Sequence, residues 1–284
     1  MVEKLQVEGG EIAFDVVGEG PLVILAHGMG DTRHSYRFVV PALVAAGFRV
    51  ANVDIRGCGE SSATWASYSR GDIAGDLLAV IRHLGGPAVI IGQSISGGAA
   101  TVAAAVAPQD VVGAIELAPF TRAQRFDLMG MLRHARHRKG MTHLATMLLR
   151  GSVPAWLRYL DLAIPQKPAD WPQEQARIAG HLGDPARMAA LRAMGQTSPA
   201  DAGEQLPHVT VPILVVMGTA DPDWADPRAE GEGVIAALRP RIGRLAVIDG
   251  AGHYPHVERP GEVVELAVPF LRSVFSAKTG AAGA

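Results

Sequence analysis

A serine stands at the point where an apolar run of the sequence gives way to a run of small residues. The β-branched run Ala88 to Ile91 predicts a strand buried on both faces, and the small residues from Gly97 to Ala107 predict a helix that packs closely on a sheet. Ser94 then lies on a sharp strand-to-helix turn, which needs small residues two positions away on either side. Gly92 and Ser96 meet that need. The spacing therefore predicts Ser94 as a nucleophile.

A second register of the same motif is open. The strict pattern is G-x-S-x-G, and this chain has Ser96 where the last glycine belongs, followed by Gly97 and Gly98. Moved two positions along the chain, the pattern makes Ser96 the nucleophile. We favour Ser94, because only that serine follows the predicted strand with a glycine two residues before it.

A serine hydroxyl is a weak nucleophile near neutral pH, so it needs a base and a carboxylate that orients the base. Asp221 follows the apolar run Ile213 to Met217, and His253 follows the run Leu245 to Ile248. Both loops are then expected at the carboxyl ends of parallel strands, where catalytic groups converge. Asp223 is an alternative orienting acid in the first of these loops.

Strand-like and helix-like runs alternate along most of the chain. The expected strands cover residues 3–17, broken at Gly9 and Gly10, then 22–26, 48–53, 88–91, 111–117, 211–217 and 244–248; the expected helices cover 36–46, 72–84, 97–107, 229–238 and 262–275. This alternation predicts an α/β fold with a mostly parallel central sheet flanked by helices.

The pattern changes between residues 121 and 206. No convincing strand occurs there, and Met, Leu, Ala and Arg recur at helical intervals between Gly and Pro breaks. We therefore expect one core, residues 1–120 and 207–284, and a helical cap inserted before the last strands, residues 121–206. The insertion has more arginine and lysine than acid. Its charge belongs either to a solvated helix surface or to a surface that draws anionic substrates toward the site.

Five short motifs follow one another in the order that one enzyme superfamily has them. They are His27–Gly30, Asp54–Ser61, Gly92–Gly97, Gly218–Asp221 and Gly252–Pro260. With these motifs the chain resembles the capped, esterase-like or lipase-like members of the α/β-hydrolase superfamily over nearly its whole length. The resemblance implies the α/β-hydrolase fold, with the cap where the insertion lies.

The resemblance also implies a role for each site residue. Ser94 is the nucleophile, Asp221 the acid and His253 the base, and the backbone N–H groups of Met29 and Ile95 form an oxyanion hole. Asp221 is favoured over the acid two residues later because it lies three residues after the glycine of its motif.

Substrate contacts are expected from Gly28 and from the inserted residues Phe126, Met129 and Trp156. An ordinary hydrophobic seam between cap and core would use the same inserted residues.

The expected reaction is cleavage of an ester-type bond in a small, largely apolar substrate through an acyl-enzyme. A serine at the elbow argues against epoxide hydrolases and haloalkane dehalogenases, for which the resemblance demands a carboxylate nucleophile. The same triad also serves C–C bond hydrolases, lactonases and perhydrolases or acyltransferases. A protein that keeps the hydrolase fold without turnover would instead be a ligand sensor.

Composition argues against several other classes. With 26 Lys and Arg against 28 Asp and Glu, the formal net charge is -2, which gives no bias toward nucleic acid. The single Cys58 cannot form a disulfide framework or a multi-thiolate metal site. The spacing of His134, His137 and His143 could bring two of them to one helix face as ligands, but the Arg and Lys residues around them would repel a divalent cation. We expect a cytoplasmic enzyme with a small-molecule substrate, no membrane span and neither metal nor other cofactor.

Overall fold

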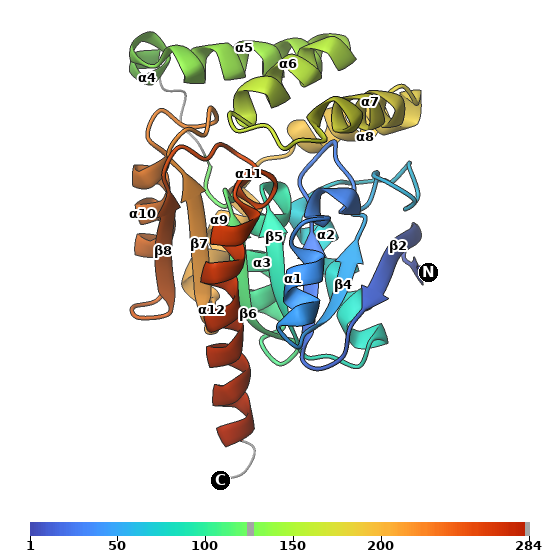
Figure 1. The fold of residues 1–284 in the computed structure, drawn as a ribbon, viewed down its shortest axis with the longest axis vertical. Coiled ribbons are helices and arrows are strands. Elements are labelled where there is room, and N and C mark those ends of the chain that lie inside the picture. The colour runs from blue at the N-terminus through green and yellow to red at the C-terminus, as the bar shows by residue number, and fades with distance from the viewer. Residues whose placement is uncertain (124–127, 282–284) are drawn as a thin grey trace.

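A computed structural model describes residues 1–123 and 128–281. An eight-stranded sheet runs through its centre in the order β1-β2-β4-β3-β5-β6-β7-β8 (Figure 1). The strands are β1 (Val2–Val7), β2 (Gly10–Val17), β3 (Leu22–Ala26), β4 (Arg49–Val53), β5 (Ala88–Gln93), β6 (Val111–Leu117), β7 (Ile213–Gly218) and β8 (Gly243–Ile248). Strand β2 pairs antiparallel with β1 and β4, and all other neighbours are parallel. The predicted α/β class with a mostly parallel sheet is confirmed.

Helices cover both faces of the sheet, and the central strands are apolar for that reason. Every residue of β3, β5 and β7 is buried. One face packs against α2 (Arg70–His83), α3 (Ile95–Val106) and α10 (Pro227–Ala237), and the other packs against α1 (Val40–Ala45) and α12 (Pro260–Ala281). The two hydrophobic cores hold the strand ends in place from both sides.

The segment expected as one helix over residues 36–46 is divided. It forms a short 3-10 helix, η1 (Arg33–Tyr36), and then α1, with Pro41 in the first turn. Proline suits the first turn of a helix but lacks the N–H that would continue an earlier one, so the helix starts again there. The Tyr36 hydroxyl lies 3.2 Å from the carbonyl oxygens of Ala26 and Ile91, which anchors η1 beside β3 and β5.

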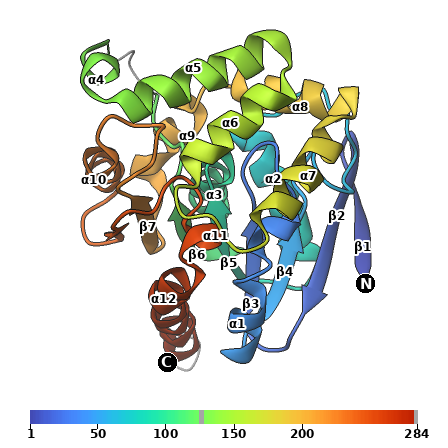
Figure 2. The same cartoon turned by 45° about the horizontal axis from the view of Figure 1, so that its top comes forward.

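The described residues between β6 and β7 form helices and no strand. The helices are α4 (Leu128–Arg133), α5 (Ala135–Arg150), α6 (Val153–Ala163), α7 (Trp171–Leu182), α8 (Pro185–Gly195), α9 (Ala200–Gln205) and η2 (Leu206–His208). Helices α5 to α8 lie across one end of the sheet (Figures 1 and 2). Helix α9 instead packs against α2 and α3, and its Ala202 belongs to the core of the sheet. Helices α4 to α8, residues 128–195, are called the cap below.

Hydropathy gives one further property of these elements. No helix within residues 1–123 and 128–281 is long and apolar enough to cross a membrane.

Trp156 lies in a hydrophobic cluster that the cap shares with the core, since Tyr254 and Val257 belong to it and Met29 packs against it. The Trp156 side chain is 1% exposed, and its ring stacks on that of Tyr159 with 5.0 Å between the centroids. Met129 of α4, by contrast, is 52% exposed. Trp156 therefore stabilises the cap, whereas Met129 contributes little to its packing.

Replacing Trp156 with alanine is expected to lower the free energy of unfolding by about 3–5 kcal/mol, because a buried aromatic ring leaves a cavity. Met129→Ala is the matched control and should change it by less than about 0.5 kcal/mol. Denaturant unfolding of the two variants measures both values. Equal effects would contradict the core position of Trp156.

Candidate active site

Ser94 lies between β5 and α3 with a left-handed backbone, φ 56° and ψ −119°. A residue other than glycine reaches such values only where its surroundings hold it there. The chain doubles back so closely that a Cβ on Gly92 would come within 2.3 Å of the Ser96 carbonyl oxygen. The Ser94 side chain is consequently carried at the tip of a tight elbow, where the residue is 4% exposed.

Ser96 has a different environment. It is fully buried, and its hydroxyl donates a hydrogen bond of 2.5 Å to the carbonyl oxygen of His27. The His27 ring nitrogen Nε2 in turn lies 3.3 Å from the backbone nitrogen of Ile55. Burial lowers the pKa of His27, so its imidazole stays neutral. Ser96 therefore ties the elbow to the loop of residues 27–32.

His253 and Asp221 form a buried pair beyond the elbow. The His253 Nδ1 lies 2.8 Å from a carboxylate oxygen of Asp221, whose other oxygen accepts the N–H of Asp223 at 2.9 Å. The Asp223 carboxylate lies 3.4 Å from the same Nδ1. Burial opposes the charged imidazolium, but the carboxylates of Asp221 and Asp223 outweigh it and raise the pKa of His253 to about 9.

Two neighbouring residues bring the serine and the histidine to one place. The amide of Gln93 donates to the His253 carbonyl oxygen at 2.9 Å. The loop that carries His253, called the base loop below, therefore packs against the residue before the serine. The backbone N–H of Phe120 donates to the Ser94 carbonyl oxygen at 3.1 Å, and the Phe120 ring lies edge-on to the His253 ring at 5.8 Å. The structure thus assembles Ser94, Asp221 and His253 at the carboxyl ends of β5, β7 and β8.

The loop of residues 27–32 approaches the elbow from the end of β3. At Gly28 the approach leaves no room for a side chain, because a Cβ would lie 2.0 Å from the Gln93 Oε1 and 3.1 Å from the Ser94 Cβ. Met29 follows directly and is partly buried. Ile95 is the first residue of α3, where backbone N–H groups have no partner within the helix. Gly28 therefore lies against the serine, Met29 follows it in the same loop, and Ile95 follows the serine in the chain.

The cap contacts the loops that carry the acid and the base. The loop that carries Asp221 is called the acid loop below. On this loop, Arg136 donates to the Ala220 carbonyl oxygen at 3.0 Å, and the His137 Nδ1 lies 2.8 Å from the Pro222 carbonyl oxygen. On the base loop, the backbone N–H of His253 donates to the carbonyl oxygen of Ala163 at 2.7 Å. Helices α5 and α6 therefore hold the site loops directly.

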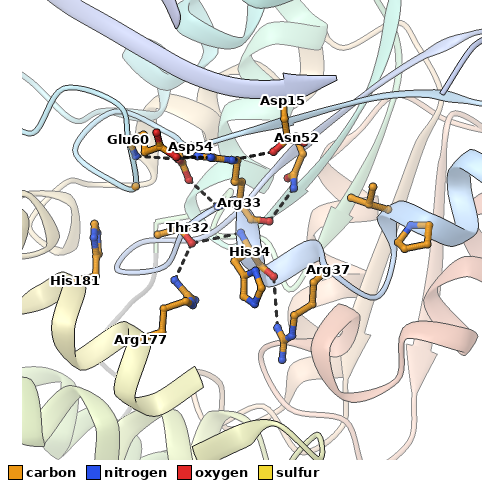
Figure 3. Close-up of a pocket in the computed structure, with 13 residues that line it drawn as sticks. Asp15, Thr32, Arg33, His34, Arg37, Asn52, Asp54, Glu60, Arg177 and His181 are labelled. Atoms are coloured by element: carbon orange, nitrogen blue, oxygen red, sulfur yellow. Dashed lines mark hydrogen bonds and ion pairs between the residues drawn. The ribbon is translucent and has the colours of Figure 1, made fainter. Parts of the chain in front are cut away.

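Helix α7 holds the third loop through Arg177. Its guanidinium donates to the Asp31 carboxylate at 2.6 Å. It also donates to the Thr32 hydroxyl at 2.8 Å (Figure 3). Burial alone would raise the pKa of the Asp31 carboxyl, but Arg177 outweighs burial and holds the pKa below its ordinary value. An ionised carboxylate is thereby fixed two residues after Met29.

A cleft of about 570 Å³ opens beside this ion pair, between α7 and the ends of β2 and β4. Figure 3 shows Arg33 inside it among the carboxylates of Asp15, Asp54 and Glu60, with which it forms ion pairs. Arg37 also lines the cleft. Its Nε lies 2.7 Å from a carboxylate oxygen of Asp170, at the start of α7. The arginines that line this cleft are paired with carboxylates, and the pair between Arg37 and the start of α7 joins cap to core.

Other arginines of the cap bond to backbone oxygens. Arg187 donates to the Ser61 carbonyl oxygen at 2.8 Å, and Arg192 donates to the Leu148 carbonyl oxygen at 2.7 Å. Together with Arg136 and Arg177, these side chains fasten the cap to itself and to the core.

The cap residues expected to touch substrate are scattered. Trp156 lies in the hydrophobic cluster between cap and core, whereas Met129 lies on the exposed surface of the cap and lines a depression beside Thr219. Phe126 lies outside the described residues. The structure therefore does not bring Trp156 and Met129 together at the serine.

The acid and base side chains also have a spacing that suits a metal ion. Ligand atoms of Asp221, Asp223 and His253 all lie within 4.8 Å of one another. Hydrogen bonds already account for this spacing, because the His253 Nδ1 faces Asp221 and the Tyr159 hydroxyl faces Asp223.

Comparison with known proteins agrees with the fold. A model described as "Alpha/beta hydrolase family" matches residues 23–266. The chain belongs to the alpha/beta hydrolase family.

Its relatives include enzymes of more than one kind. The bifunctional epoxide hydrolase 2 of Sus scrofa is 40% identical over 92 residues, which make up 31% of this chain and 17% of that protein. The chain thus matches less than a fifth of the length of the first curated relatives. Epoxide hydrolase A of Mycobacterium tuberculosis is 26% identical over 305 aligned positions, which cover 88% of this chain and 90% of that one. A thermophilic esterase from Thermogutta terrifontis has a TM-score of 0.73 and 26% identity, over 96% of this chain and 99% of that one.

Three aromatic residues beside the site of this alpha/beta hydrolase were not predicted. The rings of Phe120 and Trp224 both lie 5.8 Å from the His253 ring, and the Tyr159 hydroxyl donates to Asp223. No motif marks these residues, and their contacts depend on how loops and α6 pack. The sequence did indicate a second carboxylate, Asp223, because it lies two residues after Asp221 in the same loop.

In this alpha/beta hydrolase, Arg177→Gln is expected to lower the free energy of unfolding at pH 7 by about 1–3 kcal/mol, because it leaves the Asp31 carboxylate buried without its cation. A carboxylate with a depressed pKa contributes stability above its unfolded pKa and loses it as pH falls through the folded pKa. The difference between wild type and variant should therefore shrink below about pH 4.

Denaturant unfolding at pH 7 and at pH 3.5 or below measures both differences. A stability difference of the same size at the two pH values would show that Arg177 does not act through the Asp31 charge.

Proposed function

We propose that this alpha/beta hydrolase is a serine esterase that cleaves an ester-type bond of a small, largely apolar substrate through an acyl-enzyme. The observation that carries the proposal is the strained elbow at Ser94 beside the buried His253–Asp221 pair. Ser94, His253 and Asp221 would supply the nucleophile, the base and the orienting acid that acyl transfer requires.

The reaction begins with proton transfer. The His253 Nε2 takes the hydroxyl proton of Ser94 as the serine oxygen attacks the substrate carbonyl carbon, and the carbonyl π electrons move onto oxygen. Asp221 holds the Nδ1–H side of the ring at 2.8 Å and stabilises the imidazolium. The N–H groups of Met29 and Ile95 stabilise the oxyanion.

The tetrahedral intermediate then collapses and expels an alkoxide, which takes the proton from His253. Water repeats the sequence on the acyl-enzyme: His253 removes its proton, the hydroxide attacks the acyl carbon, and Ser94 leaves and is reprotonated. Each oxyanion donor supports both steps and is worth on the order of a hundredfold or more in rate.

A hollow of about 1330 Å³ lies between α4, α5 and the loop that follows β7. Met131, Met141, Leu149 and Trp224 are among its lining residues, and the Trp224 ring lies 5.8 Å from that of His253. Charged side chains line it as well, among them Arg122, Asp226 and Glu230. The apolar part of this lining supports a substrate with apolar groups.

The relatives support hydrolysis, and the residue at the elbow favours the ester among their reactions. The Thermogutta terrifontis structure is an esterase, whereas the curated relatives named above are epoxide hydrolases. This chain has a hydroxyl at position 94, which suits attack on an acyl carbon. Lactones, vinylogous C–C bonds and acyl transfer to other acceptors are further reactions open to the same groups.

Hydrolysis of short-chain p-nitrophenyl esters tests the proposal. Ser94→Ala and His253→Ala should each lower kcat by about 10⁴-fold or more, since each removes a member of one chemical unit. Ser96→Ala is the matched control, and its loss should stay below about tenfold because this hydroxyl only bonds a backbone oxygen.

Three outcomes would contradict the proposal. Ser96→Ala could be as damaging as Ser94→Ala, or the protein could hydrolyse styrene oxide with a rate that Ser94→Ala leaves unchanged. A purified protein that turns over no ester, resists a fluorophosphonate probe and yet melts higher with a ligand would be a sensor.

A further inference from the structure

The histidine of the site faces two carboxylates. Its Nδ1 lies 2.8 Å from Asp221 and 3.4 Å from Asp223, and all three residues are at most 3% exposed. The Nδ1 nitrogen carries one proton and can donate one strong hydrogen bond. Because the contact with Asp221 is the shorter, we assign that hydrogen bond to Asp221. Asp223 therefore adds negative charge to the imidazole without holding it in place.

Asp223 is held from the cap. The Tyr159 hydroxyl of α6 lies 3.0 Å and 2.9 Å from the two carboxylate oxygens of Asp223, and Tyr159 is 1% exposed. Stacking on Trp156 at 5.0 Å keeps the tyrosine ring in place. The contact joins residues that are 64 positions apart in the sequence.

The donated hydrogen bond favours the charged form of Asp223. Burial and the neighbouring Asp221 raise the pKa of Asp223 to about 7, while His253 and, to a smaller extent, the Tyr159 hydroxyl act in the opposite direction and favour the carboxylate. Without the tyrosine hydroxyl, a buried carboxyl two residues from another carboxylate would take up a proton more readily.

We propose, on the basis of the proposed function, that Asp223 and Tyr159 are a pair of positioning residues through which the seated cap sets how firmly His253 holds its proton. The pair acts through the histidine and touches no reacting atom. The hydroxyl from α6 favours the carboxylate over the carboxyl, and in its charged form Asp223 stabilises the imidazolium formed during acyl transfer from a second side. Loss of the tyrosine contact removes part of that stabilisation.

Other groups around His253 complete its electrostatic environment. Asp221 lies on the acid loop, Tyr254 is the next residue in the chain, and Glu258 lies in α11 (Pro255–Glu258). Burial raises the pKa of Glu258 to about 7, and its carboxylate accepts the N–H groups of Gly252 and Gln166 at 2.8 Å and 3.2 Å. These groups stay unchanged in the variants below.

The test follows the titration of His253 directly, by NMR of protein labelled with ¹³C at histidine, with His253→Gln to assign the signal. Asp223→Asn should lower the midpoint by about one pH unit, because it removes an opposite charge within 4 Å. Tyr159→Phe should lower it by less, and the double variant should match Asp223→Asn. Asp249→Asn, which removes an exposed charge four residues before the histidine, should leave the midpoint unchanged.

Kinetics give the second readout. His253 accepts a proton only when neutral, so kcat/KM for a p-nitrophenyl ester rises with pH through its pKa. That rise should move to lower pH in Asp223→Asn and Tyr159→Phe by the amounts that NMR reports.

A midpoint within 0.2 pH units of wild type in Asp223→Asn would overturn the proposal. Additive effects of the two substitutions would overturn it as well, since the tyrosine would then act by another route. The NMR shifts together with an absence of ester turnover would support the positioning pair and reject the esterase assignment.

Discussion

The left-handed backbone at Ser94 is the constraint on which the rest of the site depends. It exists only because β5 is buried between two layers of helices and α3 starts directly above it, with Gly92 leaving space for the turn. The hydroxyl of Ser96 and the amide of Gln93 then connect the elbow to the neighbouring loops. A rigid sheet thus supplies one fixed point around which the other groups gather.

The cap supplies the second set of constraints, from the opposite side. Helix α5 bonds the backbone of the acid loop, α6 bonds the base loop, and α7 bonds the loop of residues 27–32 through Arg177. The three loops leave strands β7, β8 and β3, so the cap brings segments together that the sheet alone keeps apart. The arrangement of the site loops consequently depends on these helices.

Local patterns account for what could be predicted from the sequence. The elbow, the parallel strands and the loops with Asp221 and His253 follow from apolar runs that end in small or polar residues, and each is encoded within about ten residues. Tyr159 with Asp223 and Arg177 with Asp31 are contacts between residues 64 and 146 positions apart, and they depend on how cap helices pack. The same lack of long-range information left open whether Trp156 contacts substrate or fills the seam between cap and core, and in the structure it packs in that seam.

Mass spectrometry of a covalent adduct tests the central claim most directly. The protein is treated with a fluorophosphonate, digested, and the peptide that contains both Ser94 and Ser96 is fragmented. The account predicts one phosphonyl group on Ser94, formed in wild type, greatly slowed in His253→Ala and absent in Ser94→Ala. An adduct on Ser96, or inhibition with no adduct on this peptide, would contradict it.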